Sequence, residues 1–256
     1  MNLIDSHCHL DFPAFDHDRS DVLQRCRALG IRQIIIPGTT ANRWRGILQL
    51  CRTDSGLYPA LGLHPLFTSQ HTDHHLAQLR TLIAKECPVA IGEIGLDRYR
   101  KTGDYSAQQA LFKQQLQIAR DAELPVILHI RKAHDQALQL LKKIAISGGI
   151  VHAFNGSYQQ AEQYLKLGFK LGFGGTLTYE RSTKLRALAQ ALPLESIVLE
   201  TDAPDMAVAA HQGERNSPEY LIDCLEALSK IRGKCPEQIA DQTTRNVEGL
   251  FNLVGE

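Results

Sequence analysis

Eight short apolar runs recur along the chain, and they constrain its fold more than any other feature. Each is four to six residues long and most are rich in Val, Ile or Leu; they cover residues 3–6, 33–37, 58–63, 89–93, 126–129, 149–152, 170–173 and 197–200. Continuous hydrophobicity, rather than alternation with polar residues, is expected of strands that are covered on both faces. The runs therefore predict a parallel sheet with helices on its faces.

Helical patterns lie between the apolar runs. Residues 21–29 place apolar side chains on one face and stop before Gly30, a residue suited to a helix end. Residues 106–124 form a longer amphipathic stretch followed by Pro125, and Pro218 marks a further helix start. Eight strands separated by helices fit a (β/α)₈ TIM barrel of the α/β class, but an open doubly wound sheet has the same periodicity.

Polar side chains at the ends of the runs favour the barrel. Five of the eight runs end in side chains that bind metals: His7 and His9 after the first, Glu93, His129 and His152 closing the fourth, fifth and sixth, and Glu200 and Asp202 at the eighth. In a barrel the carboxyl ends of all strands meet at one face, whereas an open sheet would spread these five strands in a row. We therefore expect residues 1–256 to form a single barrel domain.

The residue types at these ends indicate a site for divalent metal ions. Strand side chains alternate between faces, so His7 and His9 point the same way and Cys8 points oppositely, as a packing residue. Imidazole and carboxylate ligands without thiolate suit Zn²⁺, Mn²⁺ or Mg²⁺. Each residue also has a structural explanation, such as a hydrogen-bonded histidine. However, burying several unpaired ionisable groups costs several kcal/mol each.

We predict two ions, with Glu93 bridging them. His7, His9 and Asp202 hold one ion, and His129 and His152 hold the other. Paired ions activate water and stabilise the oxygens of an in-line displacement, and Asp202 is the natural general base. Asp202 and Glu93 are thus the predicted catalytic residues.

Substrate-side candidates follow the same strands. His64 ends the third run, although it also stands where it would cap the turn before Pro65. A basic rim follows the fourth and fifth runs, and solvated loop charge explains it equally well except at Arg131; its members are Arg98, Arg100, Lys101, Arg131 and Lys132. Arg215 and Asn216 lie in the loop after the eighth run. No stripe of interleaved aromatic and basic residues indicates a platform for stacked bases.

Composition narrows the class of protein. The 28 basic and 28 acidic residues cancel, which argues against nucleic-acid binding through the whole surface. Six cysteines without a CxxC pair indicate reduced thiols. No apolar run approaches the roughly 20 residues that cross a bilayer, and no signal-peptide pattern opens the chain. We expect a cytoplasmic protein with no membrane association and no obligate protein partner.

The motifs DSHCHLDF, GLHP, GEIGLD, PVILHIR, VHAFNGS and LETDAPD occur in this order. Together they resemble the TatD family of metal-dependent hydrolases, and GGTLTY and ETDAPDM resemble its YjjV-type branch. The resemblance implies a binuclear barrel enzyme with metal roles at His7, His9, Glu93, His129, His152 and Asp202. It also implies magnesium- or manganese-dependent DNase activity, and Arg215 and Asn216 match a family RN motif. Asp205 departs from the family, because nuclease members often carry an aromatic residue there.

The predicted function is therefore a metal-dependent hydrolase that cleaves phosphodiester bonds. The substrate is a small molecule or single-stranded DNA or RNA, which the enzyme would degrade as a 3′–5′ exonuclease. The alternative is an amide or ester hydrolase that acts on a small acyl substrate, because Asp205 would repel a phosphate backbone. A third hypothesis is a non-catalytic binding module that keeps its metal for structural reasons.

Overall fold

The computed structural model describes residues 1–99 and 104–253. Its backbone contacts divide the chain into two compact units. The first unit comprises Met1–Ile36 and Leu171–Glu256, and the second comprises Pro37–Lys170. The single-domain organisation stays a prediction.

The first unit contains the strands from both ends of the chain. They are β1 (Leu3–Asp5), β2 (Ile31–Pro37), β7 (Phe169–Phe173) and β8 (Ile197–Leu199). β1 pairs with β2 and β7 with β8, both in parallel, and the amide of Ser6 donates to the carbonyl of Leu199 at 3.0 Å. The helices are α1 (Arg19–Ala28), α7 (Thr183–Ala191), α8 (Leu221–Arg232) and α9 (Pro236–Phe251), and α9 packs on β1 and β8.

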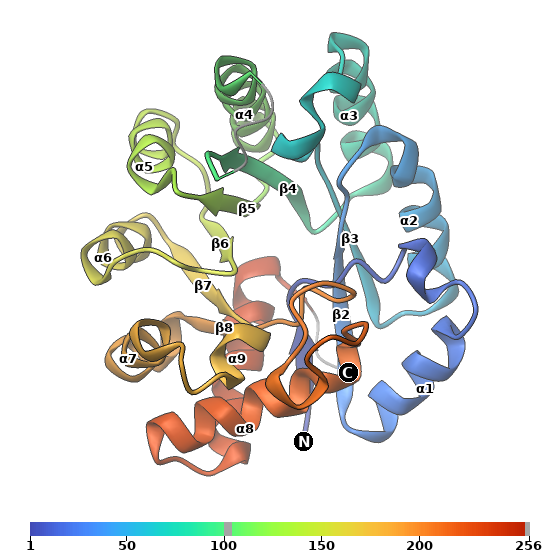
Figure 1. Cartoon of the computed structure of the whole chain (residues 1–256). Coiled ribbons are helices and arrows are strands. Elements are labelled where there is room, and N and C mark those ends of the chain that lie inside the picture. Colours follow the sequence, from blue (N-terminus) through green and yellow to red (C-terminus); the bar gives the residue numbers. More distant parts are fainter. Residues whose placement is uncertain (100–103, 254–256) are drawn as a thin grey trace. The chain divides into compact units, whose positions relative to one another are not determined.

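The second unit holds four consecutive parallel strands, which Figure 1 colours from blue to yellow-green. They are β3 (Leu57–Leu61), β4 (Ala90–Asp97), β5 (Val126–Arg131) and β6 (Gly149–His152). The helices are α2 (Ala41–Thr53), α3 (Asp73–Glu86), α4 (Tyr105–Asp121), α5 (His134–Lys143) and α6 (Tyr158–Lys166). The register pairs His129 with Gly95 of β4 on one side and with His152 of β6 on the other.

Burial along the strands agrees with the apolar runs. All eight residues of β4 are buried, as are all residues of β1, β6 and β8. The strands follow the chain order from β1 to β8, and a helix follows each one. This is the order of a (β/α)₈ barrel and confirms the predicted fold class. Among the described residues, no helix is both long and apolar enough to cross a membrane.

Several element boundaries differ from those expected. β4 continues to Asp97, beyond the predicted end at residue 93, because Ile94 to Asp97 still pair with β5. α4 ends at Asp121 rather than at residue 124, since Glu123 adopts a left-handed conformation with φ of 54°. Pro218 begins a short 3-10 turn, η6 (Pro218–Tyr220), and α8 starts only at Leu221.

Candidate metal centre

Two buried histidines leave β1 in the first unit and turn their rings toward each other. The Nε2 atoms of His7 and His9 lie 3.3 Å apart, and the rings meet edge to face. His7 is fully buried and His9 nearly so. Cys8 lies between them in the sequence and is fully buried, with its Sγ atom 3.7 Å from the carbonyl oxygen of Ala203. Burial raises the pKa of the Cys8 thiol well above its usual range, which agrees with a packing role.

Asp202 completes this group from the loop after β8. Its Oδ1 atom lies 3.5 Å from Nε2 of His7 and 3.6 Å from Nε2 of His9. Ligands at about 2.1 Å from a tetrahedral metal ion stand about 3.4 Å from one another. The three spacings therefore fit a shared divalent ion. Glu200, the other carboxylate at this strand end, lies buried against the backbone of Gly172.

The backbone of this loop is held by a second set of buried polar groups. Asp5 accepts hydrogen bonds from the amide and hydroxyl of Thr201, at 3.0 and 2.5 Å, and from the amide of His7 at 3.2 Å. Burial raises the pKa of Asp5 to about 7 even though these bonds oppose the shift. The Asn216 amide donates to the carbonyls of Thr201 and Asp205, at 2.8 and 2.7 Å. Asn216, predicted on the substrate side, thus shapes the loop that carries Asp202.

The second unit contributes another group of possible ligands, centred on Glu93 of β4. The Oε1 atom of Glu93 lies 3.0 Å from Nδ1 of His129 and 3.3 Å from Nε2 of His64. All three side chains offer ligand atoms within 4.8 Å of one another. His64 therefore lies among the candidate ligands, and its Nδ1 also accepts from the amide of Leu66, so it caps the following turn as well.

His152 closes β6 next to this group. It is buried, its ring centroid lies 6.5 Å from that of His129, and it offers a ligand atom within 4.8 Å of one on Glu93. That Glu93, His129 and His152 hold one ion together stays a prediction. The sequence analysis placed His64 on the substrate side and did not predict it among the metal ligands.

Asp97 is a functional candidate that sequence reasoning missed. It is the last residue of β4, is buried, and its Oδ2 atom lies 3.0 Å from Nε2 of His129. Burial alone would lower the pKa of His129, but the hydrogen bonds to Asp97 and Glu93 outweigh it and raise the pKa to about 9. Carboxylates that bond to a metal-binding histidine orient its ring. The sequence signal that could have identified Asp97 is its position as the acidic last residue of the GEIGLD motif.

The guanidinium groups of two further predicted residues, Arg131 and Arg215, contact other side chains. Arg131 is exposed at the end of β5, with its guanidinium over the ring of Tyr99. Arg215 makes two hydrogen bonds to the carboxylate of Asp18, at 2.8 and 2.6 Å, so its guanidinium is engaged by a carboxylate of the first unit. Arg100 and Lys101 lie outside the described residues. A substrate role for these arginines stays a prediction.

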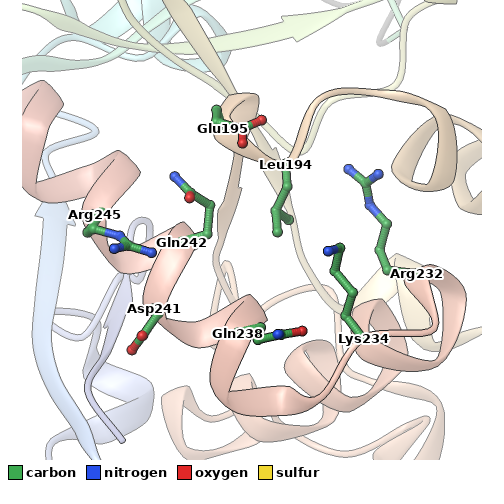
Figure 2. A pocket seen from close by; sticks show the side chains of 8 residues that line it. All are labelled: Leu194, Glu195, Arg232, Lys234, Gln238, Asp241, Gln242 and Arg245. Atoms are coloured by element: carbon green, nitrogen blue, oxygen red, sulfur yellow. The ribbon is translucent and has the colours of Figure 1, made fainter.

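A cavity of about 460 Å³ opens elsewhere in the first unit. Figure 2 shows residues of α9 along one side of it, with Leu194 and Glu195 along the other. The last two residues come just before β8, whereas Asp202 follows the end of that strand. Catalytic groups of (β/α)₈ enzymes lie at the carboxyl ends of the strands. The cavity is therefore at the wrong strand end for the active site.

Comparison with known proteins identifies the family. The family model described as TatD related DNase matches residues 4–252. The chain belongs to this family. It is 42% identical to the uncharacterized metal-dependent hydrolase YjjV of Escherichia coli K12 over 253 residues, which cover 98% of each chain. It is also 34% identical over 245 residues, or 93% of each chain, to a protein of Cronobacter sakazakii named 3′-5′ ssDNA/RNA exonuclease TatD.

Solved structures agree with this assignment. The crystal structure of the Escherichia coli YjjV protein, a TatD homologue, matches with a TM-score of 0.95 over 98% of both chains. An organophosphorus hydrolase from Deinococcus radiodurans shares the fold at 16% identity, with a TM-score of 0.71 over 97% of this chain and 92% of that one. The protein is a metal-dependent hydrolase of the TatD family, as the sequence predicted.

Proposed function

We propose that this TatD-family hydrolase cleaves phosphodiester bonds with two divalent ions bound by its histidine and carboxylate groups. The observation that carries the proposal is that each unit holds a cluster of nitrogen and oxygen ligands without thiolate. His7, His9 and Asp202 are the proposed ligands of one ion. Glu93, His129 and His152 are those of the other.

Divalent ions, when bound, activate water and neutralise the charge that develops on a phosphoryl group; Mn²⁺, Mg²⁺ and Zn²⁺ all suit these ligands. The protein's own residues supply the proton transfer and the positioning. The Asp202 side chain is 15% exposed, whereas that of His7 is fully buried. Asp202 can therefore contact solvent water and also lie beside a bound metal ion, as a general base in this site must. His64 is the proposed donor to a phosphoryl oxygen, and its Nε2 lies 3.3 Å from Oε1 of Glu93.

The relative named as a 3′-5′ exonuclease of single-stranded DNA and RNA supports the choice of bond. We infer that single-stranded nucleic acid is the substrate class and that hydrolysis proceeds from the 3′ end. The cationic side chains of Arg131 and Lys132 at the end of β5 supply local positive charge in a protein whose formal net charge is zero. A local patch is sufficient to attract a phosphate backbone.

The test is an activity screen of protein loaded in turn with Mn²⁺, Mg²⁺ and Zn²⁺. The substrates are a single-stranded oligonucleotide labelled at either end, bis(p-nitrophenyl) phosphate, and p-nitrophenyl acetate. We expect the two phosphodiesters to be cleaved and the labelled oligonucleotide to shorten from its 3′ end. Protein that binds two ions yet leaves both phosphodiesters intact would contradict the proposal.

An amide or ester hydrolase is the second candidate, and Asp205 favours it. This carboxylate lies exposed three residues after Asp202, and it would repel a phosphate backbone. Inorganic phosphate separates the two functions. It should inhibit an enzyme whose site binds phosphoryl oxygens, and it should leave acyl hydrolysis nearly unchanged.

A further inference from the structure

Tyr99 stands exposed just beyond β4, and two cations lie against its ring. The side chain is 52% exposed, which is unusual for a large aromatic residue. The guanidinium carbon of Arg131 lies 3.7 Å from the ring centroid, and the ammonium of Lys132 lies 4.9 Å from it. We call Tyr99, Arg131 and Lys132 the Tyr99 platform. The platform is not apparent in the sequence, because Tyr99 follows β4 whereas Arg131 ends β5 and Lys132 follows it.

Asp97 fixes this platform beside the candidate metal ligands. One of its carboxylate oxygens accepts from the amide of Tyr99 at 2.7 Å, and the other lies 3.0 Å from Nε2 of His129. The strand register pairs Asp97 with Arg131, and the amide of Arg98 donates to the carbonyl of Arg131 at 2.9 Å. The buried carboxylate of Asp97 thus links the exposed Tyr99 to His129, a proposed metal ligand.

The two positive charges of the platform are suited to bind an anion. Among residues 1–99 and 104–253, no carboxylate lies within ion-pair distance of Arg131 or Lys132, although the two cations share one ring. Lys132 also adopts a left-handed conformation with φ of 53°, which is uncommon for a residue with a side chain. Strained backbone of this kind clusters at ligand-binding sites.

We propose that the Tyr99 platform binds the nucleotide next to the scissile phosphodiester. Arg131 and Lys132 contact the neighbouring phosphate, and the exposed part of the Tyr99 ring stacks on the base. Phosphate contacts and base–aromatic stacking are the two interactions by which proteins hold single strands without reading their sequence. This inference rests on the proposed phosphodiesterase function and specifies a polymeric substrate rather than a small diester.

Two substrates separate the platform from the metal centre. Bis(p-nitrophenyl) phosphate has no neighbouring nucleotide, whereas a single-stranded 10-mer has one. In Tyr99→Ala and Arg131→Gln we expect KM for the 10-mer to rise roughly tenfold, since stacked bases and phosphate contacts contribute on this scale. We expect kcat/KM of Tyr99→Ala for the small diester to stay within about twofold. Tyr99→Phe keeps the ring and should behave like the unaltered protein, as should Arg120→Gln, whose side chain is exposed on α4.

Binding measured without catalysis completes the test. Fluorescence anisotropy of the labelled 10-mer with metal-stripped protein should show roughly tenfold weaker binding for Tyr99→Ala. It should also show a log–log salt slope smaller by about 0.7 for Arg131→Gln, the value for one phosphate contact on a single strand. Equal losses on both substrates, or variants that bind the 10-mer as the unaltered protein does, would overturn the platform. If neither substrate is cleaved but anisotropy still separates the variants, the proposed function fails and the platform stands.

Discussion

Asp202 shows how one residue's surroundings determine its chemistry. Its backbone has a positive φ of 57°, and its amide donates to the carbonyl of His7 at 2.8 Å. The carboxylate is thereby directed at the two imidazoles while part of it stays in contact with solvent. A carboxylate in this setting is suited both to bind a cation and to accept a proton.

Replacing Asp202 with Asn should abolish most of the activity with little effect on the fold. The amide keeps the shape but has no negative charge and accepts no proton, so we expect kcat/KM to fall by about 10²–10⁴-fold. Metal content measured by mass spectrometry should fall in parallel, while the melting temperature of metal-stripped protein stays close to the original. Asp121→Asn, at an exposed side chain at the end of α4, is the matched control. Full activity in Asp202→Asn would remove Asp202 from the mechanism.

His134 predicts a dependence of stability on pH that is independent of the metal ligands. Burial lowers its pKa below the ordinary 6.5, although the hydrogen bond to Asn155 opposes the shift. The unfolded chain therefore takes up a proton at higher pH than the folded one, and stability is lost as pH falls below about 6.5. Glutamine in His134→Gln has no group that takes up a proton in this pH range. We expect the melting temperature of the unaltered protein, relative to this variant, to decline between pH 7.5 and 5. A difference that is constant over this range would contradict the assignment.

At the scale of elements, β4 positions more of the site than any other strand. It carries Glu93 and Asp97, and its pairing with β5 sets His129 between them. Gly95 makes this close pairing feasible. It has φ of 150°, and a Cβ atom at this position would lie 2.0 Å from the carbonyl oxygen of His129.

Gly95→Ala should therefore destabilise the protein and disturb the site together. The added methyl group forces β4 away from β5, so we expect the free energy of unfolding to fall by about 2–3 kcal/mol. Urea unfolding measures this change, and hydrolysis rates should fall as well because His129 moves. Gly46→Ala in α2 is the control substitution, and its expected effect on stability has the opposite sign. Nothing lies within 4 Å of its added Cβ atom, and alanine should stabilise the helix by about 0.5–1 kcal/mol. Equal effects of the two substitutions would refute the close-contact argument.

At the scale of the whole molecule, the proposed ligands come from segments spread over almost the entire chain, from His7 to Asp202. A metal ion that binds the folded chain and not the unfolded one stabilises the fold by mass action. The metal is therefore expected to contribute to stability as well as to catalysis.

Chelation should lower the melting temperature and abolish hydrolysis reversibly. At free metal concentrations 100–1,000 times the dissociation constant, binding contributes about 2.7–4.1 kcal/mol. For a chain of this size the loss corresponds to a shift of roughly 5–15 °C. Calorimetry before and after dialysis against EDTA measures the shift, and Mn²⁺, Mg²⁺ or Zn²⁺ should restore it. An unchanged melting temperature in protein shown to be free of metal would contradict the ligand assignment.

The sequence by itself determined the strands, the fold class and the histidine and carboxylate residues at the strand ends. These features depend on neighbouring residues, since apolar runs and the alternation of His7, Cys8 and His9 are local patterns. The tertiary structure alone decided that His64 joins Glu93, that Asp97 holds His129, and that Tyr99 meets Arg131. These contacts join residues about 30 positions apart through strand register and side-chain direction. Strand register and side-chain direction cannot be read from a local pattern, because the pairing between distant strands sets both.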